Sequence, residues 1–148
     1  MTVTKHLRPV LLILFVLGYG VGCGGDSIVW EAKASSPDGS RIASVRTLQG
    51  SGPGNASLYT IVYLQQNPSS VSPTEVLGFD CEHSQVARPY VLDLANSGGS
   101  IHLTMKWVGR SHLEVTYDNH PDLYFQVVKA FGVDISVRDL SNQVTKPE

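Results

Sequence analysis

The sequence predicts a single all-β domain, an antiparallel β-sandwich or flattened barrel of about 8–9 short strands, preceded by a helical signal peptide. Short runs of alternating apolar and polar residues recur along the chain, separated by Gly, Pro, Ser and Asn. The longest alternating stretch, Ile101 to Val137, has the pattern of half-buried antiparallel strands. Capped runs of helical period are absent after the apolar N-terminal segment, so the mature chain is expected to be all-β.

The N-terminus has the layout of an export signal. Met1 to Pro9 is short and basic, with Lys5 and Arg8, and Val10 to Gly22 is an apolar run of 13 residues that ends just before Cys23. A basic region, an apolar core and a small-residue cleavage site together predict a signal peptide. A membrane-spanning helix needs about 20 apolar residues, which disfavours a permanent span.

The segment Gly20 to Cys23, GVGC, resembles the lipobox of bacterial lipoproteins, where a small residue precedes a cysteine that is lipidated and becomes the first mature residue. Gly20 departs from the pattern, since an aliphatic residue is usual there. The resemblance implies a lipid on Cys23 and a place in the bacterial cell envelope. Because Gly24 and not Asp follows the cysteine, it implies the outer membrane, facing the periplasm. A periplasmic or secreted protein without lipid is the alternative.

The expected division of the chain is a signal peptide at 1–22, a lipidated tether at 23–27, a β-domain at 28–140 and a disordered tail at 141–148. The third expected strand, Leu58–Gln65, is apolar on both faces, so we expect it to be central in its sheet and covered on both sides. Loops are expected at Ser36 to Ser40, a strong turn sequence, and at the glycine-rich Gln49 to Ser57. The strands expected before the long alternating stretch are Ile28–Ala34, Arg41–Leu48, Leu58–Gln65, Glu75–Phe79 and Tyr90–Leu94.

We expect Ile101 to Val137 to form a four-stranded meander, because residues that face the core must pair with one another. For its first hairpin this sets Trp107 opposite Leu113. Substitution of Trp107 or Phe125 by Ala is then expected to cost about 3–5 kcal/mol. The other pairs of that hairpin are Met105 with Val115, Leu103 with Tyr117, Lys106 with Glu114, Thr104 with Thr116 and His102 with Asp118. The expected apolar rows are Met105, Val115, Phe125, Val137 and Trp107, Leu113, Val127, Ile135.

The charge of the chain bears on its partners. Without Lys5 and Arg8, 9 of the 11 basic residues remain against 13 acidic ones, which gives the mature domain a net charge of about −4. No cluster of Lys and Arg lies beside aromatic residues. Nucleic acid is therefore not an expected partner.

Asp80 to His83, DCEH, is the one compact group of reactive side chains in the sequence. Cys81 and His83 are of metal-ligand type, but a structural zinc site needs four ligands and no second pair stands at a usable spacing. We therefore expect no metal and no cofactor, and a surface loop with an unpaired thiol. A small ligand- or metal-binding domain that uses Cys81 and His83 is kept as an alternative. If Cys23 is not lipidated, it could instead form a disulfide with Cys81.

No pattern of catalytic residues is evident. His102, His112 and His120 are expected to be separate surface side chains, and paired carboxylates, Gly-x-Ser-x-Gly, His-Glu-x-x-His and Walker sequences are absent. We therefore expect no enzymatic activity.

Two phrases, SPDGSRIASV and MKWVGRSHLEVTY, are similar to those of small exported bacterial domains of unassigned activity. That resemblance implies only a fold and a cellular location outside the cytoplasm. The leading hypothesis is a non-enzymatic envelope lipoprotein whose β-domain binds or braces an envelope protein at the membrane surface. An inhibitor of an exported hydrolase is a further alternative. A binding module should expose an aromatic patch, for which Tyr59, Tyr63 and Tyr124 are the candidates.

Overall fold

The computed structural model describes residues 25–50, 57–68, 71–82 and 97–142. Within these ranges every regular element is a β-strand, and no helix there is long and apolar enough to cross a membrane. The expected signal peptide, Cys23, the strand at Tyr90–Leu94 and most of the tail lie outside the described residues. The strands are β1 (Ser27–Ser35), β2 (Arg41–Gln49), β3 (Leu58–Gln66), β4 (Thr74–Asp80), β5 (Ser97–Gly98), β6 (Leu103–Trp107), β7 (His112–Tyr117), β8 (Asp122–Gln126), β9 (Lys129–Ala130) and β10 (Val133–Asp139).

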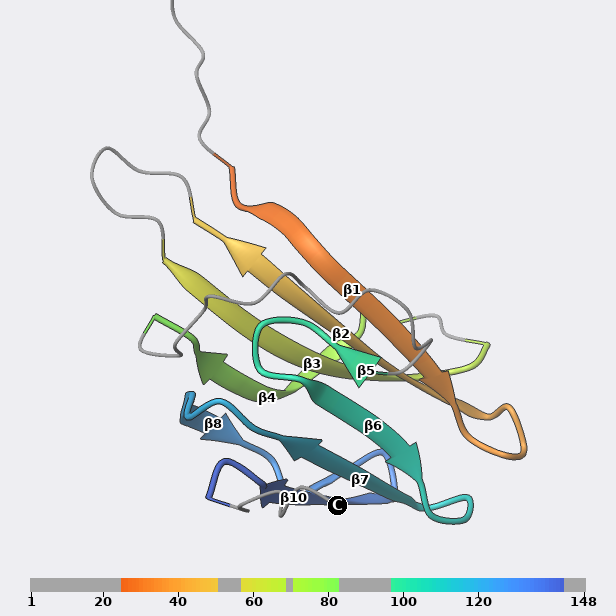
Figure 1. The fold of residues 1–148 in the computed structure, drawn as a ribbon. Coiled ribbons are helices and arrows are strands. Elements are labelled where there is room, and N and C mark those ends of the chain that lie inside the picture. Colours follow the sequence, from red (N-terminus) through yellow and green to blue (C-terminus); the bar gives the residue numbers. More distant parts are fainter. Residues whose placement is uncertain (1–24, 51–56, 69–70, 83–96, 143–148) are drawn as a thin grey trace, which may run out of the picture.

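The strands form two layers, which confirms the predicted all-β sandwich (Figure 1). One sheet has the order β1-β2-β3-β4-β8 and the other has the order β5-β6-β7-β10-β9. Each sheet turns its apolar face toward the other, because a sheet with one apolar side is stable only when that side is buried. The largest fully buried side chains are Phe79, Leu64, Leu77, Ile101, Leu103, Met105 and Leu113.

The first four strands run as consecutive antiparallel neighbours. Each was predicted to within one residue at either end. Their alternation is regular in β2, where Ala43, Val45 and Thr47 are buried while their neighbours are more exposed. The period-2 pattern therefore identifies both the strands and their buried faces.

The predicted register of the hairpin between β6 and β7 is confirmed. Trp107 lies opposite Leu113, and the flanking pairs Met105–Val115, Lys106–Glu114 and Thr104–Thr116 are also as predicted. His102 and Asp118, just beyond the paired residues, are joined by a hydrogen bond of 2.7 Å between Nδ1 and Oδ1. This register pairs apolar with apolar residues on the buried face and polar with polar residues on the outer face. Because a shift by one residue would break both sets of pairs, the sequence specifies it.

The predicted meander is wrong after β7. β8 pairs with β4 of the other sheet, and β10 lies parallel to β7, with Leu113 opposite Ile135 and Val115 opposite Val137. The predicted pairs of β8 with β7 and β10 do not form, so the two apolar rows of four residues are each interrupted. Alternation shows which face of a strand is buried, but it does not show in which sheet the strand lies.

The segment from β8 to β9 is the edge of both sheets. β8 pairs with β4, and the Val127 amide continues that ladder by donating to the Val76 carbonyl at 2.8 Å. The Ile135 amide then donates to the Val128 carbonyl at 2.9 Å, and β9 pairs with β10 in the second sheet. One continuous segment therefore closes this side of the sandwich.

A tight turn follows β9. Phe131 and Gly132, with φ of 50° and 75°, form a two-residue turn between β9 and β10. Both positive φ angles match the turn type whose twist suits a hairpin, and Gly132 adopts its angle without a steric cost. The Phe131 carbonyl accepts hydrogen bonds from Arg41 Nε and Nη2 at 3.3 and 3.1 Å, which link this turn to the start of β2.

Tryptophans close the opposite side, where β1 meets β5 and β6. Trp107 is half-buried, and its indole N–H donates to the Ala34 carbonyl at 3.0 Å. Trp30 is buried with its ring against Gly99, which leaves no room for a side chain at that glycine. The core is thus bounded on both sides by contacts between the sheets.

Phe79 and Phe125 give a matched pair of substitutions. Phe79 is fully buried and packs edge-to-face on Tyr117 with ring centroids 4.9 Å apart, whereas Phe125 is 39% exposed, contrary to its predicted place in the core. Phe79→Ala should cost about 3–5 kcal/mol in free energy of unfolding, and Phe125→Ala less than about 1 kcal/mol. Denaturant titration of both variants measures this difference, and equal losses would contradict the assigned faces.

The turn between β1 and β2 is organised by one carboxylate. Asp38 Oδ1 accepts hydrogen bonds from Ser36 Oγ at 2.7 Å, Ser40 Oγ at 2.8 Å and the Ser40 amide at 3.1 Å. These bonds favour the charged form and lower the pKa of Asp38 from 3.8 to about 2, with the Ser36 hydroxyl contributing most.

The lowered pKa of Asp38 predicts a pH-dependent contribution to stability. Because the folded pKa lies below the unfolded one, the carboxylate stabilises the fold above about 3.8, and this contribution is lost as the pH falls through about 2. The difference in Tm between the wild type and Asp38→Ala should therefore be present at neutral pH and shrink across that window. Ser40→Ala, which removes a donor and keeps the carboxylate, should weaken the same dependence. A Tm difference that stays constant down to about pH 2 would contradict this role.

Candidate functional site

The outward side of β3 is unusually rich in large side chains for a solvent face. Thr60, Val62 and Leu64 are buried, whereas Tyr59 and Tyr63 point away from the core and are half-exposed. β3 is central in its sheet, as expected, but only one of its faces is covered within the described residues. Among the described residues this strand is therefore covered on one side and not on both, contrary to expectation, and its outer tyrosines are half-exposed.

A β-bulge brings two more aromatic side chains to the same surface. Leu123 of β8 lies opposite buried Phe79, but Phe125 lies opposite Gly78, because Tyr124 is inserted between the two pairs. The extra residue shifts the alternation, so that Phe125 does not face the core as Leu123 does. Tyr124 is 59% exposed and Phe125 is 39% exposed.

Gly78 is what allows Tyr124 to lie against the sheet. A Cβ at this glycine would lie 2.6 Å from Cζ of Tyr124 and 2.7 Å from its hydroxyl oxygen, closer than real side chains approach. The hydroxyl end of the ring therefore occupies the space above the glycine. The other part of the ring is open to solvent, so β4 and β8 present an aromatic surface supported by backbone.

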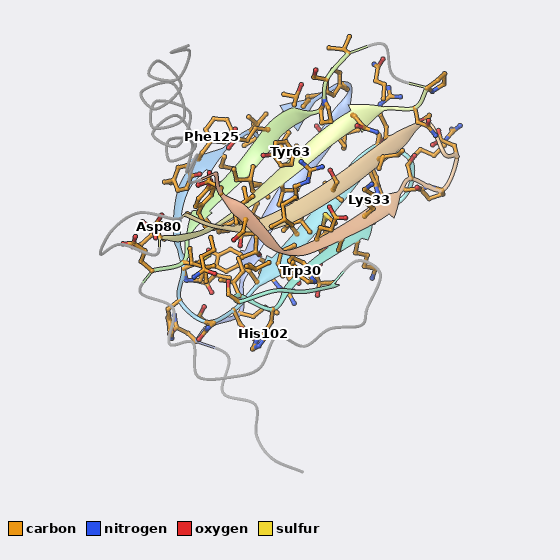
Figure 2. All side chains as sticks on the ribbon, turned by 90° about the horizontal axis from the view of Figure 1, so that it is seen from above. Trp30, Lys33, Tyr63, Asp80, His102 and Phe125 are labelled. Atoms are coloured by element: carbon orange, nitrogen blue, oxygen red, sulfur yellow. The ribbon has the colours of Figure 1, made fainter. Side chains whose placement is uncertain are left out.

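We call the surface made by Tyr59, Ile61, Tyr63, Tyr124 and Phe125 the tyrosine face. Figure 2 is viewed from the side of this face, with Tyr63 and Phe125 labelled. Tyr59 and Tyr63 flank Ile61 on the outer side of β3, and Ile61 lies opposite Gly78, the glycine that the Tyr124 ring covers. The structure thus brings together the three tyrosines that were the candidates for an aromatic patch, and adds Phe125.

Arg46 of β2 lies beside the tyrosine face. Its guanidinium carbon is 6.0 Å from the ring centroid of Tyr63, within the range of a cation–π contact. Its Nε lies 3.7 Å from Glu31 Oε2 on β1. One ring of the face is therefore already paired with a cation that a carboxylate supports.

Carboxylates lie near the tyrosines of this face: Asp26 accepts from Tyr59, and Glu75 of β4 lies opposite Tyr63. Tyr59 donates a short hydrogen bond to Asp26, which, together with partial burial, raises the pKa of Tyr59 to about 12. Burial and the charge of Glu75 raise the pKa values of Tyr63 and Tyr124. All three hydroxyls are therefore protonated at neutral pH. Tyr59 already donates its proton to Asp26, whereas the Tyr63 and Tyr124 hydroxyls can donate to a partner.

Cys81 does not lie in a surface loop, as the sequence suggested, but is buried. Its side chain is 1% exposed, since its backbone extends the ladder of β3, with the Cys81 amide donating to the Leu58 carbonyl at 2.8 Å. Its Sγ lies 3.5 Å from Thr60 Oγ1, and burial raises the pKa of the thiol. A buried, protonated thiol is a poor nucleophile and a poor metal ligand. His83 lies outside the described residues.

Each of the three histidines has a partner of its own. His102 contacts Asp118, and His112 Nε2 lies 2.7 Å from Ser136 Oγ on the outer side of the second sheet. The His120 amide donates to Ser141 Oγ at 2.9 Å. Across the described part of the chain, no three His, Cys, Asp or Glu side chains are grouped so that they could hold a metal ion.

No family model, curated protein or solved structure matches this chain. The glycine-rich loop Gln49 to Ser57 is described only at its base, where the Gly50 amide donates to the Ser57 carbonyl at 2.8 Å. The tyrosine face is therefore the candidate site that the described residues define best.

Proposed function

We propose that this chain is a bacterial envelope lipoprotein whose β-domain is a non-enzymatic binding module, and that the tyrosine face contacts its partner. The observation that carries the proposal is the exposure of Tyr124 and Phe125, 59% and 39%, beside Tyr63 on one sheet surface. Contiguous exposed apolar surface of this kind marks interaction sites in soluble domains. Tyrosine suits such a surface because its ring is apolar and its hydroxyl can pair with a polar group.

The sequence places this face close to the proposed anchor. Asp26, which binds the Tyr59 hydroxyl, follows Cys23 by three residues. Three extended residues span at most about 11 Å. A lipid on Cys23 would therefore hold the Tyr59 end of the face near the membrane surface, within reach of other envelope components.

Stability does not explain the aromatic residues of β8. Phe125 and Tyr124 keep much of their surface in water, so they contribute little to the buried core. Burial of Cys81 also counts against the alternative in which Cys81 and His83 hold a ligand or metal. Recognition of a partner remains the use that these exposed rings support best.

A photo-crosslinking amino acid at position 125 of the full-length protein, expressed in its natural host, tests this proposal. We expect a discrete adduct with an envelope component. The same residue at Thr116, on the outer side of the other sheet, is the matched control and should give none. Cys23→Ser should release the protein from the membrane fraction, remove palmitate labelling and reduce the adduct.

The absence of any adduct from position 125, or identical adducts from positions 125 and 116, would contradict a dedicated contact surface. Palmitate labelling that survives Cys23→Ser would contradict the anchor. The two parts of the proposal are thereby tested separately.

A further inference from the structure

The two halves of the tyrosine face differ in charge. On the β2 side, Tyr63 has the guanidinium of Arg46 near its ring, with Glu31 supporting that cation. On the other side, neither β4, TEVLGFD, nor β8, DLYFQ, contains a Lys or Arg. The β4–β8 half therefore presents aromatic rings and carboxylates and supplies no cation of its own.

Tyr124 of β8 lies over Gly78 of β4 in that half. Its hydroxyl end covers Gly78 while 59% of the residue stays exposed. The charges of Glu75 and Asp80 are close enough to raise the pKa of Tyr124, although burial has the larger effect. An open ring edged by carboxylates attracts a cation in two ways, through the electrons of the ring and through the charge of the carboxylates.

The surroundings of Tyr63 demonstrate the same chemistry within the chain. There a guanidinium lies 6.0 Å from a tyrosine ring and 3.7 Å from a carboxylate oxygen. At Tyr124 the ring and the carboxylates are present and a guanidinium from another molecule would complete the arrangement.

We propose that the β4–β8 half of the tyrosine face binds a basic segment of a partner protein, with an Arg or Lys of that segment over Tyr124 and facing Glu75 and Asp80. This rests on the proposed function and specifies the chemistry of the partner. An acidic surface repels the phosphates of nucleic acid and of anionic lipid, so the charge favours a cationic protein segment.

Binding of short synthetic peptides to the full-length protein in detergent micelles, followed by NMR chemical shifts, tests the inference. One peptide carries arginines spaced by Gly and Ser, and its matched control carries citrulline, which has the same shape without the charge. We expect the arginine peptide to bind, to shift the Tyr124 and Phe125 signals and to weaken with added salt. The citrulline peptide should bind detectably less.

Variants distinguish the contribution of the Tyr124 ring to peptide binding from that of the Glu75 charge. Tyr124→Ala should weaken binding of the arginine peptide by about twofold to thirtyfold, and Tyr124→Phe, which keeps the ring, should bind nearly as well as the wild type. Glu75→Gln should weaken binding and reduce its salt dependence. Thr116→Ala, on the other sheet, should have no effect. Folding of each variant is checked by its amide spectrum.

Several results would overturn the inference. The inference is wrong if the arginine peptide does not bind, or if the citrulline peptide binds as tightly as the arginine peptide. It is also wrong if Tyr124→Ala binds the arginine peptide as tightly as the wild type does. Preferential binding of a neutral glycan fragment would also overturn it, as would self-association of the wild type that Tyr124→Ala abolishes. If position 125 still gives its envelope adduct while the arginine peptide fails, the binding module stands and only the cationic partner is wrong.

Discussion

The passage of one segment, Asp122 to Ala130, between the two sheets is the constraint on which the rest of the structure depends. The segment keeps its backbone hydrogen-bonded as it changes sheets, first to β4 and then to β10. The Val127 amide and the Val128 carbonyl complete the ladders at the crossing. Because buried or edge backbone groups need partners, this arrangement joins the two layers without leaving the crossing unpaired.

The same crossing determines what the surface presents. To pair with β4, the segment accommodates a bulge at Tyr124, which turns Phe125 out of the core. Gly78 then provides the space in which the Tyr124 hydroxyl lies. Bulges often occur at sheet edges and next to functional sites, where they redirect a side chain. In this domain, the edge that closes the core therefore also produces the tyrosine face.

The sequence predicted the features that depend on local alternation. The first four strands, the buried faces and the pairing of Trp107 with Leu113 all follow from the period of two and from matched partners. The partner of β8 could not be predicted in this way, because an alternating strand fits β7 and β4 equally well by pattern. The placement of Phe125 failed for the same reason, since a bulge reverses the alternation and leaves no clear sequence signal.

For the candidate site, the sequence indicated which residue types a binding surface would use, but it did not indicate which of them lie together in the fold. The tyrosines were recognisable as residues that a binding surface would use, but their approach to one another depends on β8 joining the first sheet. Gly78 and Arg46 carried no signal of their own, since their roles arise from neighbours on other strands. Cys81 was misplaced because its amide bonds to β3 one residue beyond the end of β4 at Asp80.

The pairing of β8 with β4 is the central claim, and backbone nuclear Overhauser contacts in isotope-labelled protein test it most directly. The structure predicts cross-strand contacts that pair Phe79 with Leu123 and Gly78 with Phe125. Contacts that pair Val115 with Phe125 would instead place β8 beside β7. That result would remove the crossing and, with it, the tyrosine face.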